Sequence, residues 1–421
     1  MLTGQIPIQR PPEIDRMSAV YCIATMDTKG HEIAFVADAL RRAGVKVVTV
    51  DVGTAGPPTV APDLDRASVL ACHPRGYVGN LHQLDRNASV TLIGEALVAM
   101  LQQDHAAGKV AGVIGVGGSG GSAIIAPAMR ALPIGLPKLL VSTLASGNTA
   151  PYVGSCDITM MYPVVDVAGL NTVSREVLAN AAHAVAGMVT HRRATAAQSQ
   201  PALGMTMFGV TTPCVTAVRE SLEAAGFDCL VFHATGVGGQ AMEKLVDSGL
   251  LKGVLDLTTT EVADEVVGGI LRAGADRFEA IVRTKVPSVL SVGAMDMVNF
   301  GSLESVPPEF RGRKLHSHNA QVTLMRTTAD ENRRCARWMA DKLARATGPL
   351  EILLPERGVS ALDIAGQPFF DPEADQALFA ELERLLPSTR SRTIRRLPLH
   401  INDAEFAREA VETFQRIWVS V

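Results

Sequence analysis

The chain has 421 residues, of which 47% are hydrophobic and 19% are charged, and its formal net charge at pH 7 is −4. This length favours about two or three domains with sizeable cores. The slight negative charge and the lack of a basic tract argue against a nucleic-acid surface, and no stretch reaches the roughly 18 apolar residues of a membrane span.

Short apolar strands alternate with helical segments along the first half of the chain. A polar, proline-containing arm (residues 1–17) comes first. Strands are then predicted at 19–26, 45–52, 110–116 and 137–143, and helices at 31–44, 88–107 and near 121–131. This alternation is typical of a parallel sheet with helices on both faces.

Polar "HRRATAAQSQPA" (191–202) interrupts the alternation, which then restarts, so we place a domain boundary there. "LRRAG" (40–44) aligns with "LEAAG" (222–226) at an offset of 182, and at the same offset the strand-ending Asp51 corresponds to His233. We therefore predict an α/β protein of two duplicated Rossmann-like, doubly wound domains, 18–195 and 203–421, with mainly parallel sheets and a cleft between them. Ligands of such sheets bind at the carboxyl ends of the strands, where the strand order reverses.

A glycine-rich loop, "GVGGSGGS" (115–122), joins the third strand to a helix. Glycine permits positive φ and close approach of a ligand, and N–H groups at a helix N-terminus form an anion nest for phosphate or carboxylate. The residues that would form this nest are Gly117, Gly118, Ser119, Gly120 and Gly121. The alternative is a tight turn that uses glycine only for packing.

Two known phosphate-binding motifs do not fit this loop. It is not a Walker A loop, because no Gly-Lys-Ser/Thr follows. The spacing of Gly115, Gly117 and Gly120 satisfies GxGxxG, but a dinucleotide fingerprint belongs to the first strand of its domain rather than the third.

Two neighbouring loops carry further polar residues for the same site. "ATMDTKGHE" (24–32) ends the first strand, where Asp27 would hold a ribose hydroxyl or Mg²⁺ and Lys29 would reach phosphate. Alternatively, Asp27 or Thr28 only caps the helix that follows. "STLASGNTAPYVG" (142–154) places small polar residues at another strand end, and "YPVVDVAGLN" (162–171) adds an acid to the same pocket; the residues concerned are Thr143, Ser146, Gly147 and Asp166.

Taken together with "DITMMYPVVDVAGLN" and "HATGVGGQAME", these stretches resemble the Tm-1-like ATP-binding family over about residues 18–420. That family contains many bacterial proteins of unassigned function. The resemblance implies two Rossmann-like domains, ATP on the first domain, and a homodimer, but no reaction. It assigns the nucleotide contacts to Asp27, Thr28 and Lys29, to Gly117–Gly121, and to Thr143–Gly147.

The second half repeats the strand–glycine–helix design in "HATGVGGQAMEKL" (233–245), with His233 at the strand end and Gly236, Gly238 and Gly239 in the turn. A further strand then ends in "DLTTTE" (256–261). There Thr258, Thr259 and Glu261 would bind a hydroxylated or carboxylated substrate. The alternative is a threonine cap with the glutamate in the first helical turn.

The densest polar cluster is "RGRKLHSHNAQVTLMR" (311–326). His316 and His318 are two residues apart, so in a strand they share one face. With His233, Glu261 and Asp296 they would act as acid or base or bind a divalent metal, and structural hydrogen bonding is the alternative. An arginine can grip a carboxylate or phosphate with two hydrogen bonds, so the predicted substrate contacts here are Arg311, Arg313 and Asn319.

These features favour an enzyme that transfers phosphoryl or another group between ATP, with Mg²⁺, on the first domain and a small-molecule substrate on the second. The alternative is an ATP-binding regulatory or interaction protein. NAD-dependent oxidoreduction is disfavoured, because no GxGxxG opens the first strand–helix unit. The six cysteines form no CxxC pair, which argues against a zinc ribbon and fits a reduced, cytoplasmic location. We expect neither nucleic acid nor membrane as a partner.

Overall fold

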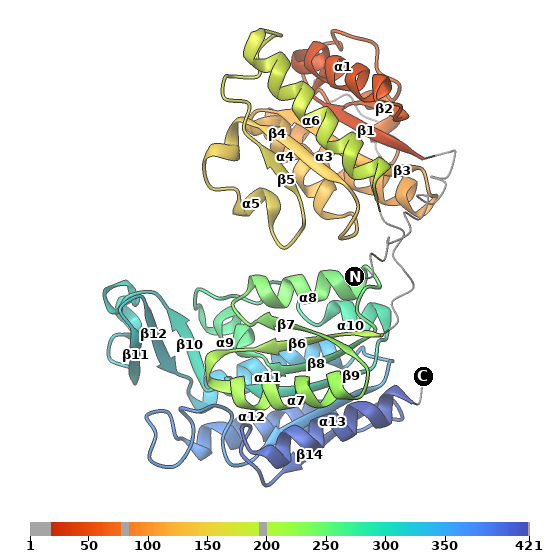
Figure 1. Ribbon diagram of the computed structural model, residues 1–421. Coiled ribbons are helices and arrows are strands. Elements are labelled where there is room, and N and C mark those ends of the chain that lie inside the picture. The colour runs from red at the N-terminus through yellow and green to blue at the C-terminus, as the bar shows by residue number, and fades with distance from the viewer. Residues whose placement is uncertain (1–17, 77–83, 193–199, 420–421) are drawn as a thin grey trace, which may run out of the picture. The chain divides into compact units, whose positions relative to one another are not determined.

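The computed structural model describes residues 18–76, 84–192 and 200–419 (Figure 1). The chain divides into two compact units, Met1–Ala197 and Gln198–Val421. The predicted N-terminal arm and most of the segment at 191–202 lie outside the described residues. Each unit is built on a parallel sheet, which confirms the predicted α/β class.

The first unit has a five-stranded parallel sheet with the order β2-β1-β3-β4-β5. Helices α1 and α6 pack on one face and α3 and α4 on the other, each pair over its own apolar core. The strands are β1 (Ala19–Ala24), β2 (Val47–Asp51), β3 (Val110–Gly117), β4 (Lys138–Ser142) and β5 (Thr159–Met161). The helices are α1 (Met26–Arg42), α2 (Arg66–Leu70), α3 (Arg86–Ala106), α4 (Ser119–Arg130), α5 (Ala150–Val153) and α6 (Thr172–Thr190).

The second unit has a six-stranded parallel sheet, β14-β13-β9-β8-β6-β7, and a separate antiparallel sheet, β10-β12-β11, which the sequence did not predict. Helices α7 and α13 cover one face of the large sheet, and the other helices pack on the opposite face. The strands are β6 (Ala202–Met207), β7 (Asp228–His233), β8 (Gly253–Thr258), β9 (Ser288–Gly293), β10 (Met297–Phe300), β11 (Leu315–Asn319), β12 (Val322–Arg326), β13 (Leu350–Pro355) and β14 (Arg392–Leu397). The helices are α7 (Thr212–Ala224), α8 (Val237–Asp247), α9 (Thr260–Val267), α10 (Glu279–Thr284), α11 (Ala329–Leu343), α12 (Pro372–Leu385) and α13 (Ala404–Trp418).

The two parallel sheets repeat one strand order, as the predicted duplication requires. In each unit the second strand lies outside the first, and the third strand lies on the first strand's other side. The first helix of each unit also ends in the same way, with Gly44 at φ +80° and Gly226 at φ +91°, 182 positions apart. Such left-handed residues terminate helices, and glycine adopts this conformation without strain.

The central strands are buried along their whole length, as expected for strands covered on both faces. Gly115 in β3 lets α4 pack close to the sheet. A Cβ atom at this position would lie 2.8 Å from Cγ2 of Ile125 and 2.9 Å from Cδ1 of Leu140. Packing therefore accounts for the first glycine of the predicted loop.

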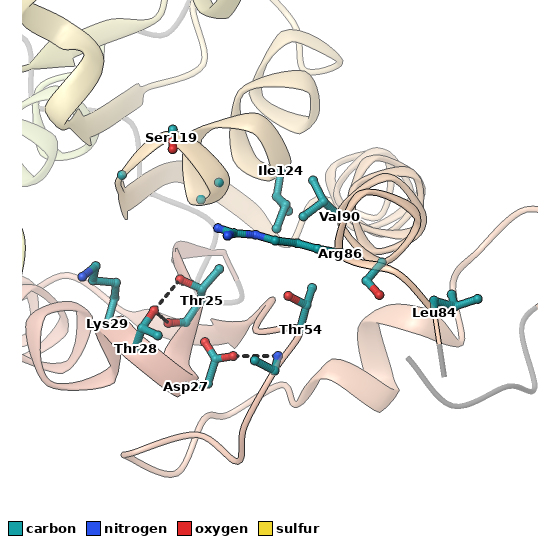
Figure 2. Close-up of a pocket in the computed structure, with 15 residues that line it drawn as sticks. Thr25, Asp27, Thr28, Lys29, Thr54, Leu84, Arg86, Val90, Ser119 and Ile124 are labelled. Carbon is teal, nitrogen blue, oxygen red and sulfur yellow. Dashed lines mark hydrogen bonds between the residues drawn. The ribbon is translucent and has the colours of Figure 1, made fainter. Parts of the chain in front are cut away.

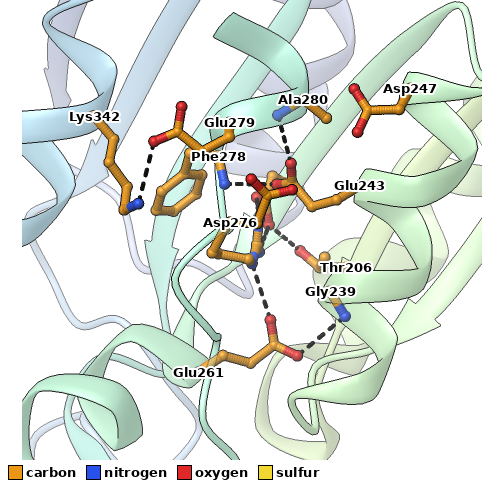
Figure 3. A network of polar contacts seen from close by, with 12 residues as sticks. Thr206, Gly239, Glu243, Asp247, Glu261, Asp276, Phe278, Glu279, Ala280 and Lys342 are labelled. Carbon is orange, nitrogen blue, oxygen red and sulfur yellow. Dashed lines mark hydrogen bonds and ion pairs between the residues drawn. The ribbon is translucent and has the colours of Figure 1, made fainter. Parts of the chain in front are cut away.

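Arg277, whose side chain is fully buried, lies at the centre of an ion network in the second unit. Its guanidinium nitrogens lie 2.6 and 2.8 Å from the Asp256 carboxylate, 3.0 Å from Glu261 and 3.3 Å from Glu243. Oγ1 of Thr206 donates a further hydrogen bond to Asp256, at 2.6 Å (Figure 3). The network therefore joins β6 and β8 to the middle of α8, to the first turn of α9 and to the residues just before α10.

Three carboxylates face this one guanidinium, so their charges are incompletely balanced. Glu243 is buried, and burial raises its pKa to about 7, although Arg277 and the N–H groups of Phe278 and Ala280 act in the opposite direction. Burial also raises the pKa of Glu261. The ion pairs fix the positions of α8 and α9, but the burial of these charges costs desolvation free energy.

No helix among the described residues is both long enough and apolar enough to span a bilayer. The six cysteines all lie in the described part of the chain and carry free thiols. Burial raises the pKa of the Cys22, Cys214 and Cys335 thiols, which keeps them protonated.

We predict that Arg277→Met lowers the free energy of unfolding by about 3–5 kcal/mol, because three buried carboxylates lose their counter-charge. Urea unfolding followed by tryptophan fluorescence reports on the second unit, since Trp338 and Trp418 are the two tryptophans of the chain. The control is Arg219→Met, at an arginine whose side chain is 40% exposed. A loss no larger than that of the control would show that the network contributes little to stability.

We predict that pH changes the stability difference between the wild type and Glu243→Gln. A carboxyl whose pKa is raised on folding stabilises the fold fully below its unfolded pKa, and this contribution is lost as pH rises through the folded pKa of about 7. Between pH 5 and 8 the wild type should therefore lose stability relative to the variant, by up to about 1.4 kcal/mol per pH unit. Urea unfolding across this range checks the sign, and a gap that stays constant or moves the other way contradicts it.

Candidate functional site

A pocket of about 540 Å³ lies at the carboxyl ends of β1, β2 and β3 in the first unit. In this sheet α1 leaves β1 on one face and α4 leaves β3 on the other, so a gap opens between the two strand ends. The pocket is lined by Thr25, Asp27, Thr28, Lys29, Thr54, Ala55, Leu84, Arg86, Ser89, Val90, Gly118, Ser119, Gly120, Gly121 and Ile124 (Figure 2).

One wall of this pocket is the N-terminus of α4. The helix begins at Ser119, two residues before the expected start, and its first intrahelical hydrogen bond runs from Ser122 N–H to Gly118 O, at 2.9 Å. The N–H groups of Ser119, Gly120 and Gly121 therefore have no intrahelical acceptor. They give this end of the pocket a partial positive charge that suits an anion.

The prediction that the glycine loop adopts positive φ angles is wrong. None of Gly117, Gly118, Gly120 and Gly121 has a positive φ, and Gly118 is extended at φ −86° and ψ −156°. The anion-binding groups are therefore those of a helix N-terminus and not of a left-handed nest. Gly117 serves close packing, because a Cβ there would lie 3.0 Å from Cα of Gly121.

Asp27 lies in the first turn of α1 and binds the loop after β2. Its Oδ2 accepts hydrogen bonds from the N–H groups of Ala55, at 2.9 Å, and Gly56, at 3.2 Å. Its Oδ1 is buried and has no hydrogen-bond partner among the described residues. The N-cap of α1 is Thr25, so the alternative in which Asp27 or Thr28 only caps the helix is wrong. The carboxylate is held by one oxygen, and its other oxygen, which lies beside Gly53, is a buried acceptor without a partner among the described residues.

Lys29 and Arg86 bring positive charge to the pocket, and within the described part of the chain the side chain of neither makes a hydrogen bond or ion pair. Lys29 interrupts the helical geometry of α1, at φ −124° and ψ 20°. Arg86 is the first residue of α3, and its Nη2 would lie 3.5 Å from a Cβ atom on Gly120. Figure 2 shows its side chain extending from α3 toward the centre of the pocket.

The far side of the pocket is apolar. Leu84, Val90 and Ile124 line it, whereas the threonines and Asp27 line the opposite side. The pocket thus combines a cationic end, free backbone donors and a hydrophobic wall. This composition suits a ligand with an anionic group and a flat or apolar group.

Four further residues predicted for this site lie beside it or away from it. Thr143 begins a 3₁₀ turn after β4, and its Oγ1 would lie 3.8 Å from a Cβ atom on Gly118. Ser146, Gly147 and Asp166 are not among the lining residues, and Asp166 is exposed in the loop after β5. Ligand contacts by these four residues stay predictions.

In the second unit, the predicted glycine turn is closed by the chain's own glutamate. Oε1 of Glu261 accepts hydrogen bonds from the N–H groups of Gly236, at 2.6 Å, and Gly239, at 3.1 Å (Figure 3). A Cβ atom on Gly238 would lie 1.8 Å from the carbonyl oxygen of His233. The three glycines therefore allow α8 to lie against β7 and the Glu261 carboxylate.

The threonines at the end of β8 make hydrogen bonds to other residues of the same unit. Oγ1 of Thr258 lies 2.7 Å from Oγ1 of Thr211, and Oγ1 of Thr259 donates to Ser291 O at 3.1 Å. Thr259 is the N-cap of α9 but makes no side-chain cap, and Glu261 lies in the first turn. Substrate contacts by these residues stay predictions.

The predicted acid–base residues of the second unit lie on separate elements. His316 packs edge-on against Phe369, His233 ends β7 against Phe208, and buried Asp296 accepts a hydrogen bond from Ser360 at 2.7 Å. The register of β11 skips His318, because a bulge lies between Ser317 and Asn319, and this bulge interrupts the alternation that would place His316 and His318 on one face.

The described residues include no group of three or more histidine, cysteine or acidic side chains arranged for a metal ion. The three residues predicted here as substrate contacts have partners within the chain. Arg313 makes two hydrogen bonds to Glu331, at 2.9 and 2.8 Å, Arg311 donates to Val306 O at 3.2 Å, and Asn319 accepts from Gln321 N–H at 2.8 Å. Arg313 therefore binds a carboxylate that belongs to the chain itself, and substrate contacts by Arg311, Arg313 and Asn319 stay predictions.

Sequence reasoning missed Arg86, Thr54 and the apolar wall. The only local signal for Arg86 is Asp85, which caps α3 by accepting the Ala88 N–H at 2.8 Å. The packing of α3 against α4 brings this helix start to the pocket, and no spacing pattern records that contact.

Comparison with known proteins places both units in one family. Residues 18–194 match the N-terminal domain, and residues 200–418 the C-terminal domain, of the uncharacterised protein family UPF0261. A UPF0261 protein of Rhizobium meliloti is 54% identical over 95% of this chain and 99% of its own length. The tomato (Solanum lycopersicum) ToMV resistance protein Tm-1(GCR237) is 46% identical over 94% of this chain and 55% of its own length. The predicted Tm-1-like resemblance is thereby confirmed.

Among solved structures, the glycosyltransferase SnogD from Streptomyces nogalater matches 94% of this chain and 99% of its own. The identity is 11% and the TM-score is 0.20, so the match carries no argument about fold or function.

Proposed function

The chain belongs to the uncharacterised protein family UPF0261, and we propose that its first domain binds ATP or a related nucleotide in the pocket between β1 and β3. The observation that carries this proposal is the meeting of three free backbone N–H groups, at Ser119–Gly121, with two cations that lack partners among the described residues, Lys29 and Arg86. Backbone donors at a helix N-terminus together with basic side chains are a common phosphate-binding arrangement.

The apolar wall supports a nucleotide over a simple phosphate. Leu84, Val90 and Ile124 offer a surface on which an adenine ring would pack, with the Arg86 side chain beside it. The volume of about 540 Å³ lies within the range of small-molecule sites.

A comparison with a helix start in the second unit supports the same proposal. There the N–H groups at the glycine-rich start of α8 bind the Glu261 carboxylate of the chain itself. At α4, which follows the third strand of its unit rather than the second, no described carboxylate binds the free N–H groups, and Asp27 binds the loop after β2 instead. An external anion would take at α4 the place that Glu261 takes at α8.

Asp27 would complete the site through its unpartnered Oδ1. Two groups fit this oxygen: a ribose hydroxyl, which would donate a hydrogen bond to it, or Mg²⁺, which it would ligate together with the phosphates. A single carboxylate is sufficient in the second case, because Mg²⁺ usually keeps several waters and takes oxygens from the nucleotide.

NAD is less well supported than ATP. Asp51, which ends β2, occupies the place of the acid that binds ribose in dinucleotide sites. Its Oδ1 accepts the N–H groups of Met26, at 3.0 Å, and Gly53, at 2.8 Å, and its Oδ2 lies 3.3 Å from Arg66. These contacts leave Asp51 little capacity to bind a ribose.

A regulatory nucleotide-binding role is the second candidate function, beside group transfer, and the composition of the pocket supports it. Asp27 is the only carboxylate among its described lining residues, and no histidine is among them. Phosphoryl transfer would require a substrate nucleophile and further groups to orient it. Steady ADP release in the presence of ATP and a pool of small hydroxylated and carboxylated substrates would favour the enzyme, and its absence the binding protein.

We predict that Lys29→Ala and Arg86→Ala each weaken ATP binding about tenfold or more, because each removes a charge-assisted contact to phosphate. Isothermal titration calorimetry measures the change. Arg42→Ala is the matched control, since Arg42 lies in the last turn of α1, at the far end from the pocket. The proposal fails if the wild type shows no saturable binding of ATP or ADP, or if neither variant differs from the control.

We predict that Asp27→Asn removes the effect of Mg²⁺ on ATP binding if Oδ1 faces the metal. The variant keeps an oxygen for the Ala55 and Gly56 N–H groups and loses the negative charge. Titrations with Mg²⁺ and with EDTA distinguish the two assignments. An equal loss of affinity under both conditions assigns Oδ1 to the ribose, and unchanged binding under both removes Asp27 from the site.

A further inference from the structure

A second pocket, of about 330 Å³, lies in the second unit beside the end of β12 and the starts of α11 and α12. We propose that it binds a small zwitterion, a molecule with one carboxylate and one ammonium group, such as an α-amino acid. The inference is independent of the nucleotide proposal, because it concerns a different domain and different residues.

The wall of this pocket includes a buried arginine that is rigidly held. Arg326 is 4% exposed, and it donates to Phe369 O at 2.6 Å, to Asp371 O at 3.1 Å and to Asp375 at 2.8 Å. A guanidinium buried among acids is weak evidence for stability, because its desolvation offsets the attraction. Arg326 also donates from Nη1 to Oγ1 of Thr327 at 2.9 Å, so its donors are used within the chain and it forms a fixed, charge-paired part of the pocket wall.

The pocket has a side that suits a carboxylate. The Lys314 ammonium has no recorded partner among the described residues, and Arg313 beside it is fixed by Glu331. Thr328 caps α11 by accepting the Glu331 N–H at 3.2 Å, so the N–H groups at the first two positions of this helix keep no intrahelical acceptor. A carboxylate would be bound there by an ammonium and by backbone donors.

The pocket also has a side that suits an ammonium group. Asp371 and Glu373 line it at the start of α12. Asp371 uses Oδ1 to accept the Ala374 N–H at 3.1 Å, and the Glu373 carboxylate has no recorded partner in the described part of the chain. A pure anion would meet these two acids, and a pure cation would meet the Lys314 ammonium, so a ligand with both charges fits best.

Size and polarity exclude a larger, apolar ligand. The lining residues are charged residues, threonines and alanines, with no large apolar side chain among them. The volume lies near the lower end for small-molecule sites. Both properties match a small polar metabolite rather than a nucleotide.

The test is ligand-observed NMR on the full chain, followed by calorimetry, with each proteinogenic amino acid as a probe. Succinate and putrescine carry only one kind of charge and serve as the comparison probes. We expect saturable binding of at least one amino acid, and binding of succinate and putrescine about tenfold weaker or more. No saturable binding of any amino acid up to about 10 mM overturns the proposal, and so does succinate or putrescine binding as tightly as the best amino acid.

Two variants locate the site. Lys314→Ala and Glu373→Gln should each weaken amino-acid binding about tenfold, since each removes one charged contact. Lys252→Ala, at an exposed lysine just before β8, is the matched control and should bind like the wild type. Unchanged affinity in both Lys314→Ala and Glu373→Gln contradicts the assignment, and ATP titrations of the same variants should match the wild type.

Discussion

The reversal of strand order between β1 and β3 determines the chemistry of the first domain. Because α1 and α4 leave the sheet on opposite faces, their first turns do not cover each other, and the backbone donors at the start of α4 remain open to a ligand. The glycines of the loop serve this arrangement through packing. Gly115 and Gly117 let α4 lie close to β3, so that its N-terminus faces the same space as Asp27 and Lys29.

The second domain has the same reversal, between β6 and β8, but uses it differently. Thr206 from β6 and Asp256 from β8 meet Arg277 there, and Glu261 binds the start of α8. The chain's own charged groups thus occupy a region that in the first domain is a pocket. One topology therefore supports a ligand site in one unit and a buried ion network in the other, and the difference lies in a few side chains.

Much of this organisation could be predicted from the sequence. The alternation of strands and helices, the offset of 182 between the halves and the end of β3 at the glycine loop all follow from local patterns and match the structure. Contacts between distant residues could not be predicted. Arg86 reaches the pocket only because α3 packs on α4, the bulge at His318 depends on the pairing of β11 with β12, and Arg313 meets Glu331 because α11 starts beside it. The φ angles of the glycine loop were predicted wrongly because glycine allows both signs of φ, and the helix start selected the negative one.

The most direct measurement of the central claim is an amide chemical-shift titration of the isotopically labelled chain with ADP. The account predicts the largest shifts at the N–H groups of Ser119, Gly120 and Gly121, which would bind the phosphates. It predicts unchanged shifts at Gly236 and Gly239, whose N–H groups are bound by Glu261. If the amides at the start of α4 do not move, or if those of α8 move instead, the first domain does not bind a nucleotide in the way proposed.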